Sequence, residues 1–217
     1  MTRVLLVRHG RSRANAAGIL AGRAEGVELD ETGQAQARAL AEQLRQVPIA
    51  AAYRSPILRC RQTAEMLGFP EATVVEGLNE CDYGQWSERD LATLAQEGLW
   101  AAIQSEPSSV TFPGGESMLA MRERATEAIT DIVDRHGPED VVIVVSHGDP
   151  LKAILAEALG MPFDKFQRLH VAPASVSLVQ YTDPQPRVLA VNTDGSILAT
   201  VADPEPAQPG GGDSPRQ

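Results

Sequence analysis

Two short apolar runs, far apart in the chain, each end in a histidine followed by a glycine, and this paired pattern restricts the folds open to the chain. Residues 4–7 lead into Arg8-His9-Gly10, and residues 141–145 lead into Ser146-His147-Gly148. Runs of four or five apolar residues are too short for a buried helix and are typical of strands covered on both faces, as in a parallel sheet. Ligands bind at the carboxyl ends of such strands, so we expect both histidines and Arg8 to face one crevice, where they suit an anion such as phosphate.

Segments with helical spacing follow the first strand. After a loop over residues 11–28, Thr32 is expected to cap a first crossover helix. A second strand is expected at 49–53, followed by a helix with Ser55 as its N-cap and Pro56 at its first position. Arg59 then falls about one turn into that helix, near the carboxyl end of the second strand.

The rest of the chain continues this alternation. We expect a short strand at 73–75, an irregular loop at 77–86, a helix at 90–104, a long amphipathic helix capped by Ser117, a helix capped by Asp149 after the strand at 141–145, and a terminal pair of strands at 171–181 and 188–191 with an antiparallel edge. These elements predict an α/β fold, a three-layer α/β/α sandwich around a mostly parallel central sheet.

The length of 217 residues suits one domain with a sizeable core. We expect that domain to span residues 1–202 and to carry a helical insert at about 87–136. Residues 203–217 are rich in Pro and Gly and are expected to form a flexible tail.

The composition excludes several partners. A net charge of −10 and a pI near 4.9 argue against a nucleic acid or an anionic membrane surface. The amino terminus has no apolar segment of signal-peptide length and no run is long enough to cross a membrane, so we expect a cytoplasmic protein. In that reducing compartment Cys60 and Cys81 are expected to be free thiols. The pattern indicates no particular oligomeric state.

The residues at the predicted strand ends match the demands of phosphomonoester hydrolysis. Either His-Gly pair alone is typical of a turn, but two of them together with Arg59 and Glu80 favour a catalytic site. Arg8 and Arg59 can stabilise the charge on the transferring phosphoryl oxygens, and His9 can attack phosphorus. His147 can donate to the phosphoryl oxygens, while Glu80 can protonate the leaving alkoxide and later activate water.

Four motifs occur in order along the chain and resemble those of one family. They are Arg-His-Gly-x-Ser at 8–12, Ser-Pro-Ile-Leu-Arg at 55–59 with Thr63-Ala64 behind it, Leu78-x-Glu80-x-x-x-Gly84, and Ser-His-Gly at 146–148. Over about residues 3–200 the chain is similar to the histidine phosphatase superfamily, which includes the cofactor-dependent phosphoglycerate mutases. The resemblance implies a phosphoglycerate mutase-like fold.

The resemblance also implies roles for individual residues. His9 is implied as the phosphorylated nucleophile, Arg8, Arg59 and His147 as the phosphate pocket, and Glu80 as the acid and base. Asn15, at the spacing of the family pattern, is implied as a further phosphate donor. No cofactor and no metal are expected, and the only partner implied is a small phosphomonoester substrate.

Three alternatives to a phosphatase stay open. A phosphoglycerate mutase-like phosphomutase would use the same five residues, namely Arg8, His9, Arg59, Glu80 and His147. The stretch at 112–117, Phe-Pro-Gly-Gly-Glu-Ser, is more similar to phosphatase members, which favours hydrolysis. A non-catalytic phosphate-binding module would not need Glu80. A two-metal phosphoesterase is disfavoured because no His-x-x-x-His, Cys-x-x-Cys or Asp-rich ligand spacing occurs.

Several residues have both structural and functional interpretations. His136 and His170 are expected to be structural. Tyr83 and Trp86 suit either substrate contact or loop anchoring. Arg11, Arg13 and Arg23 either enlarge a positive mouth of the site or are simply solvated.

Overall fold

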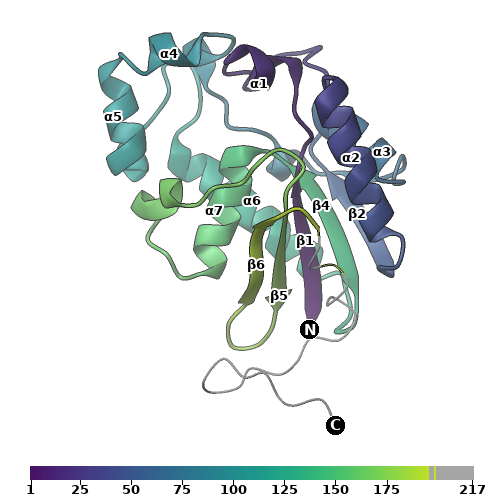
Figure 1. Ribbon diagram of the computed structural model, residues 1–217. Helices are drawn as coiled ribbons and strands as arrows, with labels where there is room; N and C mark the ends of the chain where they lie inside the picture. The colour runs from purple at the N-terminus through teal and green to yellow at the C-terminus, as the bar shows by residue number, and fades with distance from the viewer. Residues whose placement is uncertain (196–197, 199–217) are drawn as a thin grey trace.

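A six-stranded sheet forms the centre of the computed structural model, which describes residues 1–195 and 198. Its strands are β1 (Thr2–Arg8), β2 (Ile49–Arg54), β3 (Thr73–Val74), β4 (Val141–Ser146), β5 (Val176–Tyr181) and β6 (Arg187–Thr193). They lie in the order β3-β2-β4-β1-β5-β6 (Figure 1). The first four of these run parallel, and β5 pairs antiparallel with both β1 and β6. The predicted mostly parallel sheet with an antiparallel edge is confirmed.

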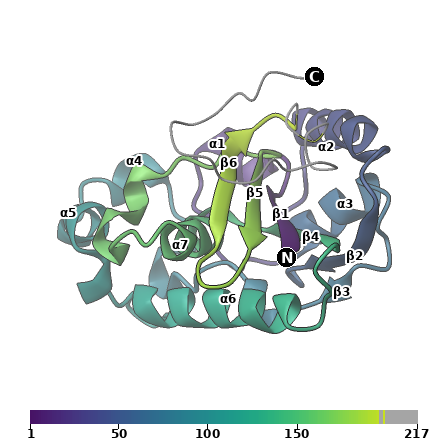
Figure 2. The same ribbon diagram turned by 90° about the horizontal axis from the view of Figure 1, so that it is seen from below.

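Helices cover both faces of the sheet, as Figure 2 shows from below. The helices are α1 (Arg13–Ala17), α2 (Glu31–Leu44), α3 (Leu58–Met66), α4 (Leu91–Leu94), α5 (Gly98–Ser105), α6 (Met118–Val133) and α7 (Gly148–Ala158). α6 and α7 pack on one face and α2 and α3 on the other. The chain is therefore the predicted α/β/α sandwich.

The apolar run of β1 is continuous because both of its faces are buried. Val4 and Leu6 point to the layer of α6 and α7, while Leu5 and Val7 point to the layer of α2 and α3. Side chains alternate across a strand, so one uninterrupted run supplies both cores. A third apolar cluster joins α5 and the loops around it to the outer side of α7.

Three predicted helix starts were wrong. Asp30, not Thr32, caps α2 by accepting a hydrogen bond from Gly33 N. α3 begins at Leu58, three residues after Ser55, and α7 begins at Gly148, before Asp149. Ser, Thr and Asp side chains can form hydrogen bonds at a helix N-terminus or with other nearby groups. Their position in the sequence therefore did not determine where the helices begin.

Three segments also differ in regularity from the prediction. The loop at 11–28 contains α1, because Ser12 and Asn15 form a capping box. The helix expected at 90–104 is two helices, α4 and α5, because the chain leaves the helical conformation at Glu97. The strand expected from 171 starts at Val176, after a turn in which Ala174 has a φ of 58°.

Two expectations fall partly or wholly outside the described residues. The predicted tail at 203–217 lies wholly outside them, and the predicted domain, 1–202, lies outside them at residues 196–197 and 199–202. Among the described residues, no helix has both the length and the apolar composition needed to cross a bilayer.

Candidate active site

The two His-Gly pairs lie side by side at the carboxyl edge of the sheet. β1 and β4 are parallel neighbours with Arg8 opposite Ser146, so His9 and His147 both follow at the same edge. Their ring centroids are 5.2 Å apart, and His9 N donates to Ser146 O over 3.0 Å. The two histidines meet at one edge of the sheet as predicted, but only His9 lines the crevice that both were expected to face.

Gly10 is required because the chain passes close to the start of α2. A Cβ on Gly10 would lie 2.5 Å from the carbonyl oxygen of Gly33, which no side chain tolerates. Gly10 N also donates to Thr63 Oγ1 over 3.1 Å, which ties the strand end to α3. The glycine after His9 therefore fixes the position of the imidazole in the crevice.

His9 is held as a neutral imidazole whose Nε2 carries no proton and accepts a hydrogen bond. Its Nδ1 is 2.8 Å from Gly10 O, and because a carbonyl only accepts, Nδ1 carries the proton. Arg59 Nε donates to Nε2 over 3.0 Å. Burial, followed by the charges of Arg59 and Arg8, holds the pKa of His9 well below its usual value. An unprotonated Nε2 is the atom through which an imidazole can act as a nucleophile.

Two guanidinium groups beside His9 keep buried donors without a partner. Arg59 is 2% exposed; its Nη2 donates to Gly22 O, whereas its Nη1 has no partner. Arg8 donates from Nη1 to Val171 O, whereas its buried Nε has no partner. A buried unpaired donor is unfavourable by about 1–3 kcal/mol, and an anionic oxygen would relieve that cost. This charge arrangement suits a phosphoryl group.

Glu80 lines the same cavity as His9, Arg8 and Arg59 and is poised to exchange a proton near neutral pH. The residue is 8% exposed, and its Oε1 accepts from Cys81 N over 3.0 Å. Burial, with the negative charge of Asp149 adding to it, raises the pKa of Glu80 to about 7. A carboxyl group with that pKa can act as both general acid and general base.

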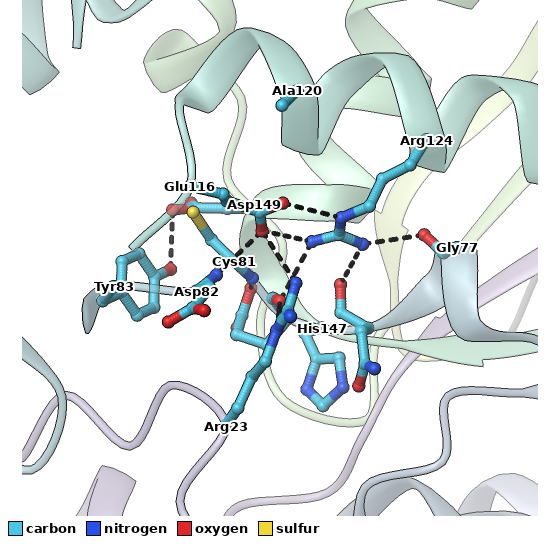
Figure 3. Close-up of polar contacts among 12 residues, drawn as sticks. Arg23, Gly77, Cys81, Asp82, Tyr83, Glu116, Ala120, Arg124, His147 and Asp149 are labelled. Carbon is cyan, nitrogen blue, oxygen red and sulfur yellow. Dashed lines mark hydrogen bonds and ion pairs between the residues drawn. The ribbon is translucent and has the colours of Figure 1, made fainter. Parts of the chain in front are cut away.

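An arginine on α6 holds the backbone that carries Glu80 (Figure 3). Arg124 Nη1 donates to Gly77 O over 2.8 Å and to Asn79 O over 2.7 Å. Arg124 Nη2 donates to Glu80 O over 3.0 Å. One guanidinium therefore fixes three carbonyls of a loop that has little regular structure of its own.

Glu116 links this arginine to a second one. Its Oε1 accepts from Arg124 Nη2 at 2.6 Å, from Arg23 Nη2 at 2.9 Å and from Asp82 N at 2.8 Å (Figure 3). Arg23 Nε also donates to Glu80 O over 2.8 Å. Burial alone would raise the pKa of Glu116, but the hydrogen bonds from Arg124 and Asp82 hold it below its usual value. Sequence reasoning missed this cluster.

Asp149 is a second acidic residue of the site that the sequence prediction treated only as a helix cap. Tyr83 Oη donates to its Oδ2 over 2.8 Å (Figure 3), and Lys152 Nζ lies 2.7 Å from its Oδ1. Burial alone would raise its pKa, but Lys152 and the hydrogen bond from Tyr83 hold it below its usual value. The available signal was a carboxylate directly after His147-Gly148 at a strand end.

One cavity of about 270 Å³ joins most of these residues. Arg8, His9, Arg59, Glu80 and Asn15 all line it. The side-chain oxygen of Asn15 is used to cap α1, where it accepts from Ser12, so its amide nitrogen is the donor left for a ligand.

His147 is fully buried behind His9 and does not line that cavity. Its Nε2 is 2.8 Å from Ser55 Oγ, which gives Ser55 a role that the predicted helix cap obscured. Burial, with the charge of Arg59, holds the pKa of His147 well below its usual value, so the ring is neutral.

The positive mouth considered for the site does not form. Arg11 pairs with Asp30 at 2.7 Å and Arg13 with Glu28 at 3.3 Å, and neither lines the cavity. Arg23 is committed to Glu80 and Glu116, as described above. Arg11 and Arg13 thus form ion pairs away from the cavity lining, and Arg23 belongs to the cluster around Glu116.

Cys60 and Cys81 are free and buried, as predicted. Burial outweighs the charge of the neighbouring Arg59 and raises the pKa of Cys60 to about 12. His136 has a structural position, with its Nε2 2.8 Å from Tyr53 Oη and its Nδ1 3.2 Å from Asp140. Within residues 1–195 and 198, no group of three or more His, Cys, Asp or Glu side chains could hold a metal ion.

Comparison with known proteins matches one family over nearly the whole described chain. The model of the histidine phosphatase superfamily (branch 1) matches residues 4–194. Phosphoserine phosphatase 1 of Hydrogenobacter thermophilus is 30% identical over 202 residues, which cover 88% of this chain and 92% of the relative. The metal-independent phosphoserine phosphatase of Arabidopsis thaliana is 35% identical over 166 residues, covering 71% and 67%.

Other similar proteins carry different names. A protein of Proteus mirabilis named "Probable phosphoglycerate mutase GpmB" is 32% identical over 188 residues, covering 83% of this chain and 86% of the relative. Among solved structures, Bacillus stearothermophilus YhfR aligns with a TM-score of 0.81 at 27% identity, covering 89% of this chain and 98% of that protein.

Proposed function

Because the chain belongs to the histidine phosphatase superfamily and is therefore a metal-independent phosphatase of small phosphorylated metabolites, we propose that it hydrolyses its phosphomonoester through a phosphohistidine formed on His9. The observation that carries the proposal is the geometry around that ring. A neutral Nε2 is bonded by Arg59 Nε, and Arg59 Nη1 and Arg8 Nε are buried donors without a partner beside it. These donors can bind the phosphoryl oxygens and stabilise their charge during transfer.

In the first half of the reaction, His9 Nε2 forms a bond to phosphorus as the bond to the ester oxygen breaks. Glu80, protonated near neutral pH, gives its proton to the departing alkoxide. The alcohol leaves, the phosphoryl group stays on His9, and Glu80 becomes a carboxylate.

In the second half, water attacks the phosphohistidine. Glu80 takes a proton from that water, the bond between phosphorus and Nε2 breaks, and inorganic phosphate leaves. The imidazole keeps its Nδ1 proton throughout, because Gly10 O accepts from that nitrogen.

We assign supporting roles to two further residues. Asn15 donates from its side-chain nitrogen to a phosphoryl oxygen at the rim of the cavity. His147, which does not line the cavity, supports the ring of His9 from behind, and Ser55 holds it there. Its burial as a neutral ring leaves it as a hydrogen-bonding group and not as a second charge.

A single-turnover experiment with a substrate radiolabelled in its phosphoryl group, quenched rapidly without acid, tests the proposal. We expect a phosphoprotein that is stable to alkali and labile to acid, and we expect no label in His9→Ala. A non-catalytic phosphate-binding module predicts no turnover in either protein. Equal turnover in the wild type and His9→Ala would reject the phosphohistidine.

A phosphomutase is the second candidate, since relatives with a mutase name align over most of the chain. It would use the same five residues and differ in keeping the phosphoryl group from water. Product analysis separates the two reactions. Stoichiometric inorganic phosphate supports hydrolysis, whereas an isomerised phosphate ester without free phosphate supports the mutase.

We also propose that residues 1–202 form one catalytic domain with its helical insert at about 87–136. Ile103 and Phe112 of the insert share an apolar cluster with Ala153 and Ala156 of α7, which supports a common core. Limited proteolysis that released the insert as a stable fragment would contradict this. The cytoplasm is the proposed location, in keeping with two buried free thiols, and cell fractionation tests it.

A further inference from the structure

The cavity that contains His9 and the two arginines also has an aromatic wall. The rings of Trp86 and Trp100 are stacked, with centroids 6.4 Å apart and planes 19° apart. Trp86 also meets Phe112 edge to face at 5.6 Å, and Phe112 meets Tyr83 at 5.0 Å. All four residues line the cavity, so one continuous series of rings borders it.

Aliphatic and amide side chains complete the lining on this side. Trp100, Ile103 and Gln104 of α5 lie three and four residues apart and all reach the cavity, because that spacing places them on one face of the helix. Ile19 and Leu20 approach from the loop after α1. The insert, the loop after α1 and the segment that carries Trp86 together form an apolar surface with an amide at its border.

Apart from the residues assigned to phosphoryl transfer, which are Arg8, His9, Arg59 and Glu80, the charged residues of the same lining are paired with each other. Besides Arg8, Arg59 and His9, the described lining residues provide one basic group, Lys152. Its Nζ is shared between Asp149 Oδ1 and Gln167 Oε1, both at 2.7 Å, and it lies 4.8 Å from the centre of the Phe166 ring. Asp149 in turn accepts from Tyr83.

A charged leaving alcohol would therefore find a poor partner here. A carboxylate on the substrate would have to compete for Lys152 with Asp149, and an ammonium would have to compete for Asp149 with Lys152. Breaking a largely buried pair to form another brings little net gain. An apolar ring or branched chain, in contrast, gains by leaving water against the aromatic wall.

Taking the proposed phosphatase function as given, we infer that the alcohol half of the substrate is uncharged and largely apolar, and that it lies against Trp86, Trp100 and Ile103. The substrate class is thus a phosphomonoester of an aromatic or branched aliphatic alcohol. This differs from a phosphorylated amino acid or a phosphorylated hydroxy acid, which would place a charge beside the same wall.

Steady-state phosphate release from four alkyl phosphates tests the inference. The set is 3-phenylpropyl phosphate, ethyl phosphate, O-phospho-L-serine and 3-phosphoglycerate. Each releases an aliphatic alkoxide, so differences in kcat/KM report mainly on contacts of the alcohol half. We expect 3-phenylpropyl phosphate to exceed each charged substrate by about tenfold or more, since tenfold corresponds to only 1.4 kcal/mol.

A matched pair of variants on α5 ties the preference to the wall. Trp100→Ala should lower the ratio of kcat/KM for 3-phenylpropyl phosphate to that for ethyl phosphate by about tenfold. Leu99→Ala removes an apolar neighbour on the same helix that does not line the cavity and should leave the ratio unchanged. A ratio that is unchanged in Trp100→Ala, or that falls equally in both variants, would overturn the role of the wall.

The result that overturns the substrate class is distinct from failure of the proposed function. If phosphoserine or 3-phosphoglycerate has the highest kcat/KM and Lys152→Met removes that advantage, the cavity recognises a charged alcohol and the inference is wrong, while the phosphatase function stands. Absence of phosphate release from all four substrates would count against the proposed function itself, and the inference would fall with it.

Discussion

Arg59 Nε donates a 3.0 Å hydrogen bond to His9 Nε2, the ring atom that the mechanism requires as nucleophile. The bond directs the electron pair of Nε2 toward the guanidinium group. Arg59 comes from α3 and His9 from the end of β1, and Thr63 of α3 also binds the backbone of Gly10. The helix and the strand end therefore act as one rigid unit.

Replacing Arg59 by lysine tests this relationship. Lysine keeps the charge but cannot contact His9, Gly22 O and a phosphoryl oxygen with three N–H groups in one plane. We expect kcat/KM for an alkyl phosphate to fall by about 10²–10³-fold, the range for loss of a transition-state donor. Arg61→Lys, on the exposed side of the same helix, is the matched control and should keep nearly full activity. Comparable losses in the two variants would show that the helix and not the guanidinium geometry is responsible.

The pH dependence of the reaction should report the protonation of Glu80. Its pKa is raised to about 7 by burial and by Asp149, and the protonated form is the one that serves the leaving alkoxide. Turnover of an alkyl phosphate should therefore decrease as the pH rises through about 7. Glu80→Gln should lower kcat by about 10²–10⁴-fold and remove that alkaline limb. With p-nitrophenyl phosphate, whose leaving group needs no proton, the loss in kcat/KM, which reports only the steps up to phosphoryl transfer to His9, should be much smaller.

Removing the charge of Asp149 should shift the same limb. Because its negative charge raises the pKa of Glu80, Asp149→Asn should move the alkaline limb of kcat to lower pH. Tyr83→Phe removes the hydrogen bond to Asp149 but leaves the carboxylate in place, so it should move the limb less. A full pH profile of each variant checks the order of the shifts. An alkaline limb at the same pH in Asp149→Asn and in the wild type would show that Asp149 does not raise the pKa of Glu80.

The meeting of His9 and His147 could be predicted from the sequence, because two buried strands that run parallel bring their carboxyl ends to one edge. Glu80 could be placed only through the family motif, since the loop around it has no periodic pattern. The roles of Ser55, shortly before α3, and of Asp149, in the first turn of α7, were obscured because the same side chains commonly act as helix caps near such positions. Glu116 lies 36 residues beyond Glu80, and its contact with Arg23 depends on how three loops pack, which no local pattern encodes.

The carboxylate of Glu116 should stabilise the protein and position Glu80. It joins Arg23 and Arg124, which both donate to Glu80 O, and its side chain is 17% exposed. Glu116→Gln keeps the shape of the side chain but removes the negative charge that compensates the two guanidinium groups of Arg23 and Arg124. We expect about 2 kcal/mol of destabilisation, below the roughly 3–5 kcal/mol of a fully buried pair because of the residual exposure, or roughly 4–8 °C in Tm.

The direction of the pH effect follows from the lowered pKa of Glu116. Its contribution to stability is present above its unfolded pKa and is lost as the pH falls through the lower folded value, so the difference in Tm between wild type and Glu116→Gln should shrink in acid. Glu97→Gln, which breaks an exposed pair with Arg89, is the control and should change Tm by only about 1 °C. If Glu116 also positions Glu80, Glu116→Gln should lower kcat/KM for an alkyl phosphate more than for p-nitrophenyl phosphate, because only the alkyl leaving group needs the Glu80 proton during phosphoryl transfer. An equal decrease with both substrates would assign Glu116 a purely structural role.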